Sequence, residues 1–234
     1  MQVGLEIDHD DLFPTSSASL DLPRRPAWTP GISREELERN EEVYYRRWLN
    51  SLLASVPSSS LSFFEQNLQV WRQLWRVGEM SDILIVVVDA RHPVIHFPPS
   101  LYRWIKEDLG RQMVLVINKA DLVSDRVLAA WEEYFQRRFP GLHVARFSCY
   151  PRAKGEEKGQ EGLRGVGKAR KRGGRRAAVG VREVLEACRS VEVLKKGKKV
   201  DWDEIIEKYE RSEQERRVQR MQTGTPATRA FIFG

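Results

Sequence analysis

Cysteine residues and long apolar runs are scarce in this sequence of 234 residues. Cys149 and Cys188 are the two cysteines, too few for a disulfide framework or a four-thiolate zinc site. The longest aliphatic run covers residues 83–88 and is far shorter than the about 20 residues that span a bilayer. The acidic N-terminal residues have no basic region followed by an apolar one, so no secretory signal is expected. These absences argue against a secreted disulfide-rich protein and a membrane protein, and they predict a location in the cytosol or nucleus.

Aromatic residues make up only 9 % of the chain, but 41 % of its residues are hydrophobic, enough for a core. The net charge of +6 is local, because residues 152–176 hold ten Lys or Arg side chains against three Glu, a balance of +7. The rest of the chain therefore carries about −1. This basic segment has few apolar side chains that could offset the entropy of ordering it. We predict that it is a disordered loop.

Two helices are predicted before the first strand. Residues 1–32 are rich in proline and irregular, and then Ser33 with Glu36 forms a capping box that opens a helix running to about residue 54. A second capping box, Ser62 with Glu65, predicts the start of another helix.

One apolar stripe marks this second helix. Leu68, Trp71 and Trp75 are spaced three and four residues apart and so share one face. Such a stripe is more often a packing surface than a ligand site. We predict that these tryptophans are part of the core.

Continuous apolar runs then alternate with helical segments. Residues 83–88, 113–117 and 144–147 read as strands, and residues 99–109 and 125–138 read as the helices between them. Continuous apolar strands separated by helices are typical of a parallel sheet that is covered on both faces. The predicted class is therefore α/β, with three strands visible, N-terminal helices and the basic loop.

Two further helices are predicted beyond the basic loop, over residues 181–194 and 201–221. The chain then ends with the apolar run 231–234, which could be the first residues of another strand.

The tetrapeptide Asn118-Lys119-Ala120-Asp121 directly follows the second predicted strand. Open α/β sheets bind ligands beyond the carboxyl ends of their strands. A carboxylate at Asp121 can accept hydrogen bonds from both N1–H and the exocyclic amino group of guanine, a pattern that adenine does not offer. We predict that Asn118 braces the loop and that the methylene stem of Lys119 covers the ring. The alternative, ordinary loop residues, is disfavoured by the strand directly before the motif.

Two neighbouring segments carry weaker signals. Ser148 and Cys149 follow the third strand, where guanine-binding proteins use a Ser-Ala turn to contact the base oxygen through a backbone amide. A plain strand end is an equally good interpretation of this pair. Arg91 and His92 follow the first strand, where they could face a nucleotide or could be structural, with Arg91 paired to a neighbouring acid.

The order of the motifs is unusual, because nothing like a phosphate loop comes before Asn118. Instead, a helical region and the segment 89–93 precede it. In this order the chain resembles the circularly permuted GTPases of the YlqF/YawG type over about residues 26–150, including the strings 71–77 and 97–99. This resemblance implies a GTPase-like sheet, binding of GTP or GDP, a role in ribosome assembly and a nuclear or nucleolar location.

The phosphate-binding motifs of that family are missing from these residues. The sequence contains no Gly-Lys-Ser, Gly-Lys-Thr or Asp-x-x-Gly, and Gly162–Lys168 only mimics a phosphate loop, since Ala169 replaces the hydroxyl that would bind magnesium. The chain is therefore expected to be the N-terminal part of such a protein, cut before the phosphate loop. We expect weak or absent GTP/GDP binding, Mg²⁺ only if the missing half were present, and no hydrolysis by the chain alone.

The resemblance also implies a division of the chain. The predicted parts are an irregular lead-in, the N-terminal helices, the guanine-recognition half of the GTPase domain, the basic loop and a helical segment, over residues 1–32, 33–80, 81–150, 151–180 and 181–234. Without a neighbouring strand, residues 83–88 would form an apolar edge, which predicts marginal stability or association.

The alternative function is non-catalytic binding of RNA, pre-ribosomal particles or another partner through the basic loop, because polycations bind nucleic acid without sequence preference. The densest cationic stretch is equally well explained as a nuclear-import signal or as a solvated loop. Its residues are Lys168, Arg170, Lys171, Arg172, Arg175 and Arg176.

Overall fold

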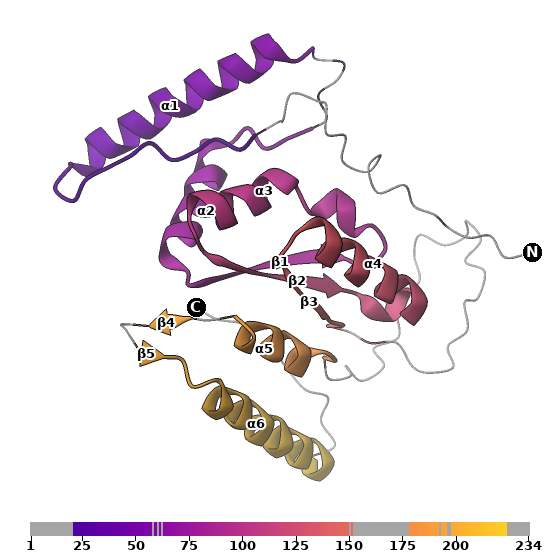
Figure 1. Cartoon of the computed structure of the whole chain (residues 1–234). Coiled ribbons are helices and arrows are strands. Elements are labelled where there is room, and N and C mark those ends of the chain that lie inside the picture. The colour runs from indigo at the N-terminus through magenta and orange to yellow at the C-terminus, as the bar shows by residue number, and fades with distance from the viewer. Residues whose placement is uncertain are drawn as a thin grey trace, which may run out of the picture. The chain divides into compact units, whose positions relative to one another are not determined.

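The computed structural model describes residues 21–57, 59, 61, 63–149, 151, 178–191, 193–195 and 198–223 (Figure 1). Predictions for the basic stretch Lys168–Arg176, for Ser62 and for residues 231–234 lie outside them. The chain divides into two compact units, one made of Met1–Leu84 with Phe97–Met113 and the other of Ile85–His96 with Val114–Gly234. No described helix is long and apolar enough to cross a membrane.

The first unit begins with two helices. Helix α1, Arg34–Ser55, starts as predicted, with the hydroxyl of Ser33 accepting a hydrogen bond from the amide of Glu36 at 3.2 Å. Helix α2, Leu68–Met80, starts five residues later than predicted. The predicted helix start after Ser62 is wrong, because residues 63–67 are not helical and the side chain of Asn67 caps the helix, accepting from the Gln69 amide at 2.9 Å.

The predicted tryptophan stripe of α2 is a packing surface. Trp75 is 1 % exposed, and its indole N–H donates to the carbonyl of Pro23 at 2.8 Å. Trp71 packs edge-on against Trp48 of α1, with ring centroids 6.1 Å apart. These contacts join α2 to both α1 and the segment before it.

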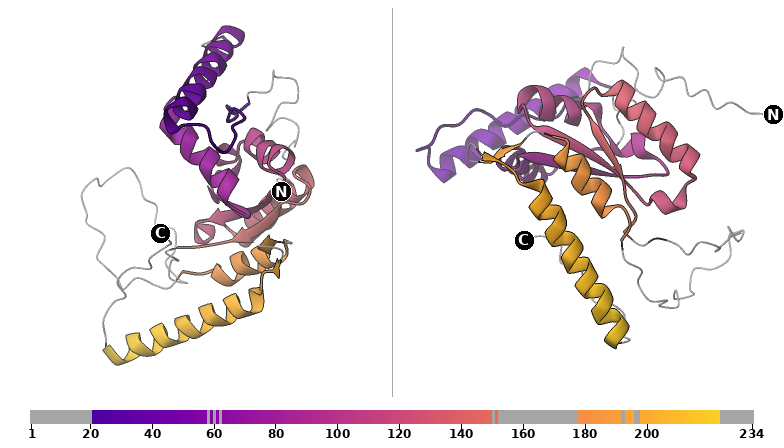
Figure 2. Two further views of the ribbon diagram at one scale, coloured as in Figure 1. Left: turned by 90° about the vertical axis from the view of Figure 1, so that its left-hand side faces the viewer. Right: turned by 60° about the horizontal axis from the view of Figure 1, so that its bottom comes forward.

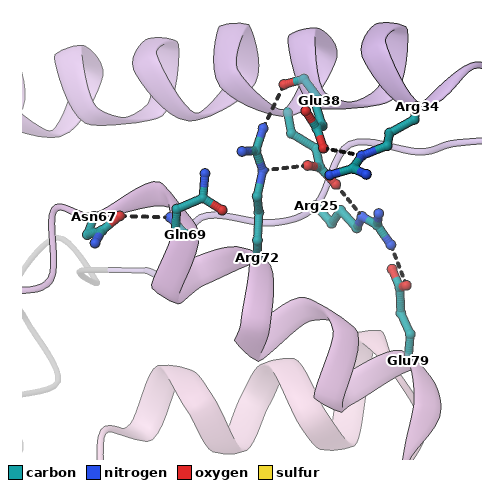
Figure 3. A network of polar contacts seen from close by, with 8 residues as sticks. Arg25, Arg34, Glu38, Asn67, Gln69, Arg72 and Glu79 are labelled. Carbon is teal, nitrogen blue, oxygen red and sulfur yellow. Dashed lines mark hydrogen bonds and ion pairs between the residues drawn. The ribbon is translucent and has the colours of Figure 1, made fainter.

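A buried carboxylate also joins these segments. Glu41 is 2 % exposed and accepts hydrogen bonds from Arg25 Nε at 2.8 Å and from Arg72 Nε at 2.7 Å. Arg25 reaches on to Glu79, and Arg72 donates to the carbonyl of Glu38, as Figure 3 shows. A buried charge is tolerated only with such partners, so the network fixes how α1 lies on α2.

The predicted helix over residues 99–109 forms as two turns of different type. Helix α3, Pro99–Arg103, continues into a π-helical turn, η3, Trp104–Asp108, and Gly110 with φ of +60° follows. Trp104 packs so closely on Gly78 of α2 that a Cβ there would lie 2.6 Å from its ring. Only glycine fits at this helix crossing.

The second unit contains the sheet, apart from the first two residues of β1 and of β2. Strands β1, Ile83–Asp89, β2, Gln112–Asn118, and β3, His143–Arg146, form a parallel sheet in the order β1-β2-β3, with Leu115 opposite Val144. The predicted α/β class is confirmed, and the sheet is consistent with part of a P-loop GTPase fold.

Burial differs between the strands. Residues 113–117 of β2 are all buried, as a strand covered on both faces requires. The same expectation is wrong for β1, where Ile85 is 49 % and Val87 is 57 % exposed. Strand β1 lies at an edge of the sheet, whereas helices α4 and α5 of this unit pack on β3.

These two helices lie on opposite sides of β3 (Figures 1 and 2). Helix α4, Asp125–Arg138, forms over the predicted residues and buries Leu128 and Phe135. Two short 3₁₀ turns, η2, Pro93–His96, and η4, Ala120–Leu122, follow β1 and β2.

The C-terminal part of this unit differs from the prediction. Helix α5, Val181–Arg189, ends five residues before residue 194, because the chain turns to bury Val191, which is 4 % exposed. A two-stranded antiparallel hairpin follows, β4, Leu194–Lys195, with β5, Lys198–Lys199. Helix α6, Trp202–Thr223, then forms as predicted and packs on α5.

Candidate functional site

Backbone hydrogen bonds connect the segments that follow the three strands. The amide of Ala90, after β1, donates to the carbonyl of Asn118 at 2.8 Å. After β3, the amide of Phe147 donates to Ile117 at 2.9 Å, and its carbonyl accepts from Ala120 at 3.0 Å. The three loops at the carboxyl edge of the sheet are therefore fixed to one another, at the edge where open α/β sheets bind ligands.

Ser148 holds Asp121 at two atoms. Its hydroxyl accepts from the Asp121 amide at 3.0 Å and donates to Asp121 Oδ1 at 2.6 Å. Ser148 is 4 % exposed, whereas the Asp121 side chain is half-buried. Because one hydroxyl contacts both the backbone and the carboxylate of Asp121, this contact orients the Asp121 side chain.

The residues before Asp121 form a tight turn. Lys119 has φ of +61°, and its amide donates to Asn118 Oδ1 at 2.7 Å. A side chain that accepts from the next amide supports this left-handed conformation, which is uncommon outside glycine. Asn118 Oδ1 thus holds the first amide after β2, and its bracing role in a ligand site stays a prediction.

The ammonium group of Lys119 pairs with Asp89 at the end of β1. Lys119 Nζ lies 2.7 Å from Asp89 Oδ2, and the same oxygen accepts from Arg91 Nη2 at 2.7 Å. Asp89 Oδ1 accepts from both Arg91 Nε and the Arg91 amide at 3.0 Å. These hydrogen bonds, those of Arg91 first, hold the pKa of Asp89 far below its usual range although burial opposes the shift. Arg91 thus pairs with a neighbouring acid, one of the two interpretations left open by the sequence.

A segment distant in sequence closes one side of the site. Ser148 and Val179 exchange backbone hydrogen bonds of 2.8 and 2.9 Å. Gly180 follows with φ of +96°, and a Cβ there would lie 2.1 Å from the carbonyl oxygen of Arg146. Helix α5 therefore begins directly against the end of β3, which only glycine permits.

The structure brings most of the predicted site residues together. Asn118, Lys119 and Asp121 lie on one turn, and Ser148 contacts Asp121, while Cys149 is a half-buried free thiol next along the chain. The six basic residues predicted as a second site lie outside the described chain. No group of three or more His, Cys, Asp or Glu able to hold a metal is found among the described residues.

Sequence reasoning missed two parts of the site. Asp89 ends a strand at the carboxyl edge, and this position was the signal that could have identified it. The contact of Val179 and Gly180 with β3 follows a long intervening segment and left no local signal.

Known proteins share much of this sequence. The chain is 41 % identical over 192 residues to guanine nucleotide-binding protein-like 1 of both Rattus norvegicus and Homo sapiens. The chain is homologous to guanine nucleotide-binding protein-like 1. The match to guanine nucleotide-binding protein-like 1 covers 82 % of this chain and 31 % of each relative, so the chain spans about a third of their length.

A plant protein shares a shorter region. GTPase LSG1-2 of Arabidopsis thaliana is 43 % identical over 123 residues, which are 51 % of this chain and 21 % of that protein. No protein-family model matches the chain. The first of these relatives is named as guanine nucleotide-binding and the second as a GTPase.

Proposed function

We propose that this chain is the guanine-recognition half of a circularly permuted GTPase of the YlqF/YawG type. The observation that supports this proposal is the orientation of the Asp121 carboxylate by the buried Ser148 hydroxyl at the carboxyl edge of the sheet. In this proposal Asp121 accepts N1–H and the 2-amino group of guanine, and Lys119 lies along the ring. The amide of Cys149 donates to the base oxygen, as the resemblance implies.

Affinity in the proposed site comes from the base. The sequence contains no Gly-Lys-Ser, Gly-Lys-Thr or Asp-x-x-Gly, and charge-assisted phosphate contacts are about twice as strong as neutral hydrogen bonds. We therefore expect the 234 residues to bind GDP or GTP at about the millimolar level, worth roughly 4 kcal/mol, without hydrolysing GTP. Mg²⁺ would act only with phosphate-binding residues that these residues do not supply.

The test is a nucleotide titration followed by NMR, with the 234-residue chain, Asp121→Asn and the matched control Asp125→Asn. Asp125 lies four residues on and its side chain is 99 % exposed. We expect wild type and the control to prefer GMP over AMP, and Asp121→Asn to lose about tenfold or more in GMP affinity. The variant should gain affinity for xanthosine monophosphate, whose 2-oxo group accepts from the new amide. Equal binding of GMP and AMP by wild type would refute the proposal.

A second candidate function rests on the charge of residues 152–176, a balance of +7. In this proposal the basic segment binds RNA or pre-ribosomal particles and directs the protein to the nucleus or nucleolus. Deleting these residues should abolish salt-sensitive RNA retention and alter the location of a fluorescent fusion. If both were unchanged, neither role of the segment would stand.

A further inference from the structure

We propose that Asp89 is a positioning residue for guanine recognition and acts by holding Lys119 in place. This inference rests on the proposed function and adds a residue that neither the motif nor its neighbours identify. The observation behind it is the contact of Lys119 Nζ with Asp89 Oδ2 at 2.7 Å, between the residue that follows β2 and the last residue of the neighbouring strand β1.

Asp89 is itself fixed. Its side chain is 12 % exposed, and the backbone amide, Nε and Nη2 of Arg91 all donate to it. The backbone beside it is also held, because the amide of Ala90 donates to Asn118. The limited exposure of the side chain and the backbone amides of Ala90 and Arg91, which do not depend on the Arg91 guanidinium, are enough to keep the carboxylate in one orientation. Its other partner, Lys119, is therefore directed to one place.

Lys119 is the opposite kind of residue. Its side chain is 48 % exposed, and a lysine in solvent samples many rotamers. Pairing with Asp89 stretches the methylene stem from the end of β2 toward the end of β1 before any ligand arrives. The stem is then already placed to cover a purine ring whose edge Asp121 binds, and less side-chain freedom is lost on binding.

An ordinary surface ion pair would have the same distance but a different consequence. Half-exposed pairs contribute little to folding, so a merely structural pair would leave ligand affinity unchanged. A positioning pair changes ligand affinity only while Lys119 keeps its charge. Lys119→Met retains an apolar stem of similar length and removes the ammonium group, which separates the two cases.

The experiment compares wild type, Asp89→Asn, Lys119→Met, the double variant and Arg91→Ala in NMR titrations with GMP and AMP. Each variant loses the prior ordering of one long side chain. We therefore expect Asp89→Asn and Lys119→Met each to weaken GMP binding by about threefold to tenfold. The double variant should bind no more weakly than Lys119→Met. Arg91→Ala removes the other cation from the same carboxylate, and its GMP affinity should stay within about twofold of wild type.

Hydrogen exchange without nucleotide gives a readout independent of binding. Amides of residues 118–121 should exchange faster in Asp89→Asn and Lys119→Met alike, and at the wild-type rate in Arg91→Ala. The inference is overturned if Asp89→Asn leaves GMP affinity unchanged, if it weakens binding further in the Lys119→Met background, or if Arg91→Ala weakens binding as much. A wild type without preference for GMP over AMP refutes the proposed function and this inference with it, whereas a preference that survives Asp89→Asn refutes this inference alone.

Discussion

Ser148→Ala should weaken both folding and guanine binding, because one hydroxyl serves two atoms of Asp121. The variant removes the acceptor of the Asp121 amide, at 3.0 Å, and the donor to Asp121 Oδ1, at 2.6 Å. Loss of a partner for a buried amide costs about 1–3 kcal/mol, and a hydrogen bond to a charged group contributes about 1.5–3 kcal/mol. Water can replace part of the second contact, since Asp121 is half-buried.

We therefore expect a loss of about 2 kcal/mol in the free energy of unfolding, or about 4–8 °C in Tm for a chain of this size. GMP affinity should fall by about threefold to tenfold, because the carboxylate is no longer held in one orientation. Calorimetry and an NMR titration on the same samples measure the two effects.

Ser124→Ala is the matched control. Ser124 also accepts a backbone amide, that of Val127 at 3.4 Å, but it caps α4 and contacts no carboxylate among the contacts described. The control should lose about 1 kcal/mol of stability and keep its GMP affinity. A Ser148→Ala protein that is destabilised as expected but binds GMP like wild type would refute the orienting role of the serine.

Three other perturbations have definite outcomes. Glu41→Ala leaves two guanidinium groups without their shared carboxylate and should lower the free energy of unfolding in urea by about 3–5 kcal/mol. Glu42→Ala, at an exposed ion pair, should change stability by less than about 0.5 kcal/mol. Equal effects of the two substitutions would contradict the role of the buried network. Replacing Ile85 and Val87 together by lysine should reduce concentration-dependent light scattering, because both side chains are about half exposed on an edge strand. A wild-type protein that stays monomeric at high concentration would exclude association through this strand. The folded-state pKa of Asp89 is lowered, so its contribution to stability is present above the unfolded pKa of about 3.9 and is lost as the pH falls below it. Unfolding free energies measured between pH 5 and 2 should fall less steeply for Asp89→Asn than for wild type, and parallel curves would show that this ionisation does not contribute.

Local patterns in the sequence predicted the elements whose signals are local. The aliphatic runs gave the three strands within one residue at each end, and the hydroxyl of Ser33 caps α1 as its sequence context indicates. The predicted start of α2 was wrong because the helix is capped by Asn67, five residues after Ser62, and no capping box marks that position in the sequence. The end of α5 depended on the burial of Val191, which no periodicity of the helix reveals.

The candidate site also has a part that the sequence predicted and a part that it did not. Residues 118–121 form a contiguous motif with a defined chemistry, so they could be named from the sequence alone. The partners of that motif come from the ends of β1 and β3 and from Val179, which are 30 and more residues away from one another. Their roles depend on the strand order and on contacts between particular atoms. Neither can be read from the composition of the sequence or from the spacing of its residues.

The bridge between Ser148 and Val179 makes the chain between them a closed ring in the sense of polymer theory. The two ends of that ring meet beside Asp121, at a residue that orients it. In general, each doubling of the length of such a ring costs only about 0.6 kcal/mol of closure entropy. Insertions or deletions within residues 152–177 should therefore be tolerated by the guanine site, so this segment can diverge in length and charge while the bridge and the base-recognition turn remain unchanged.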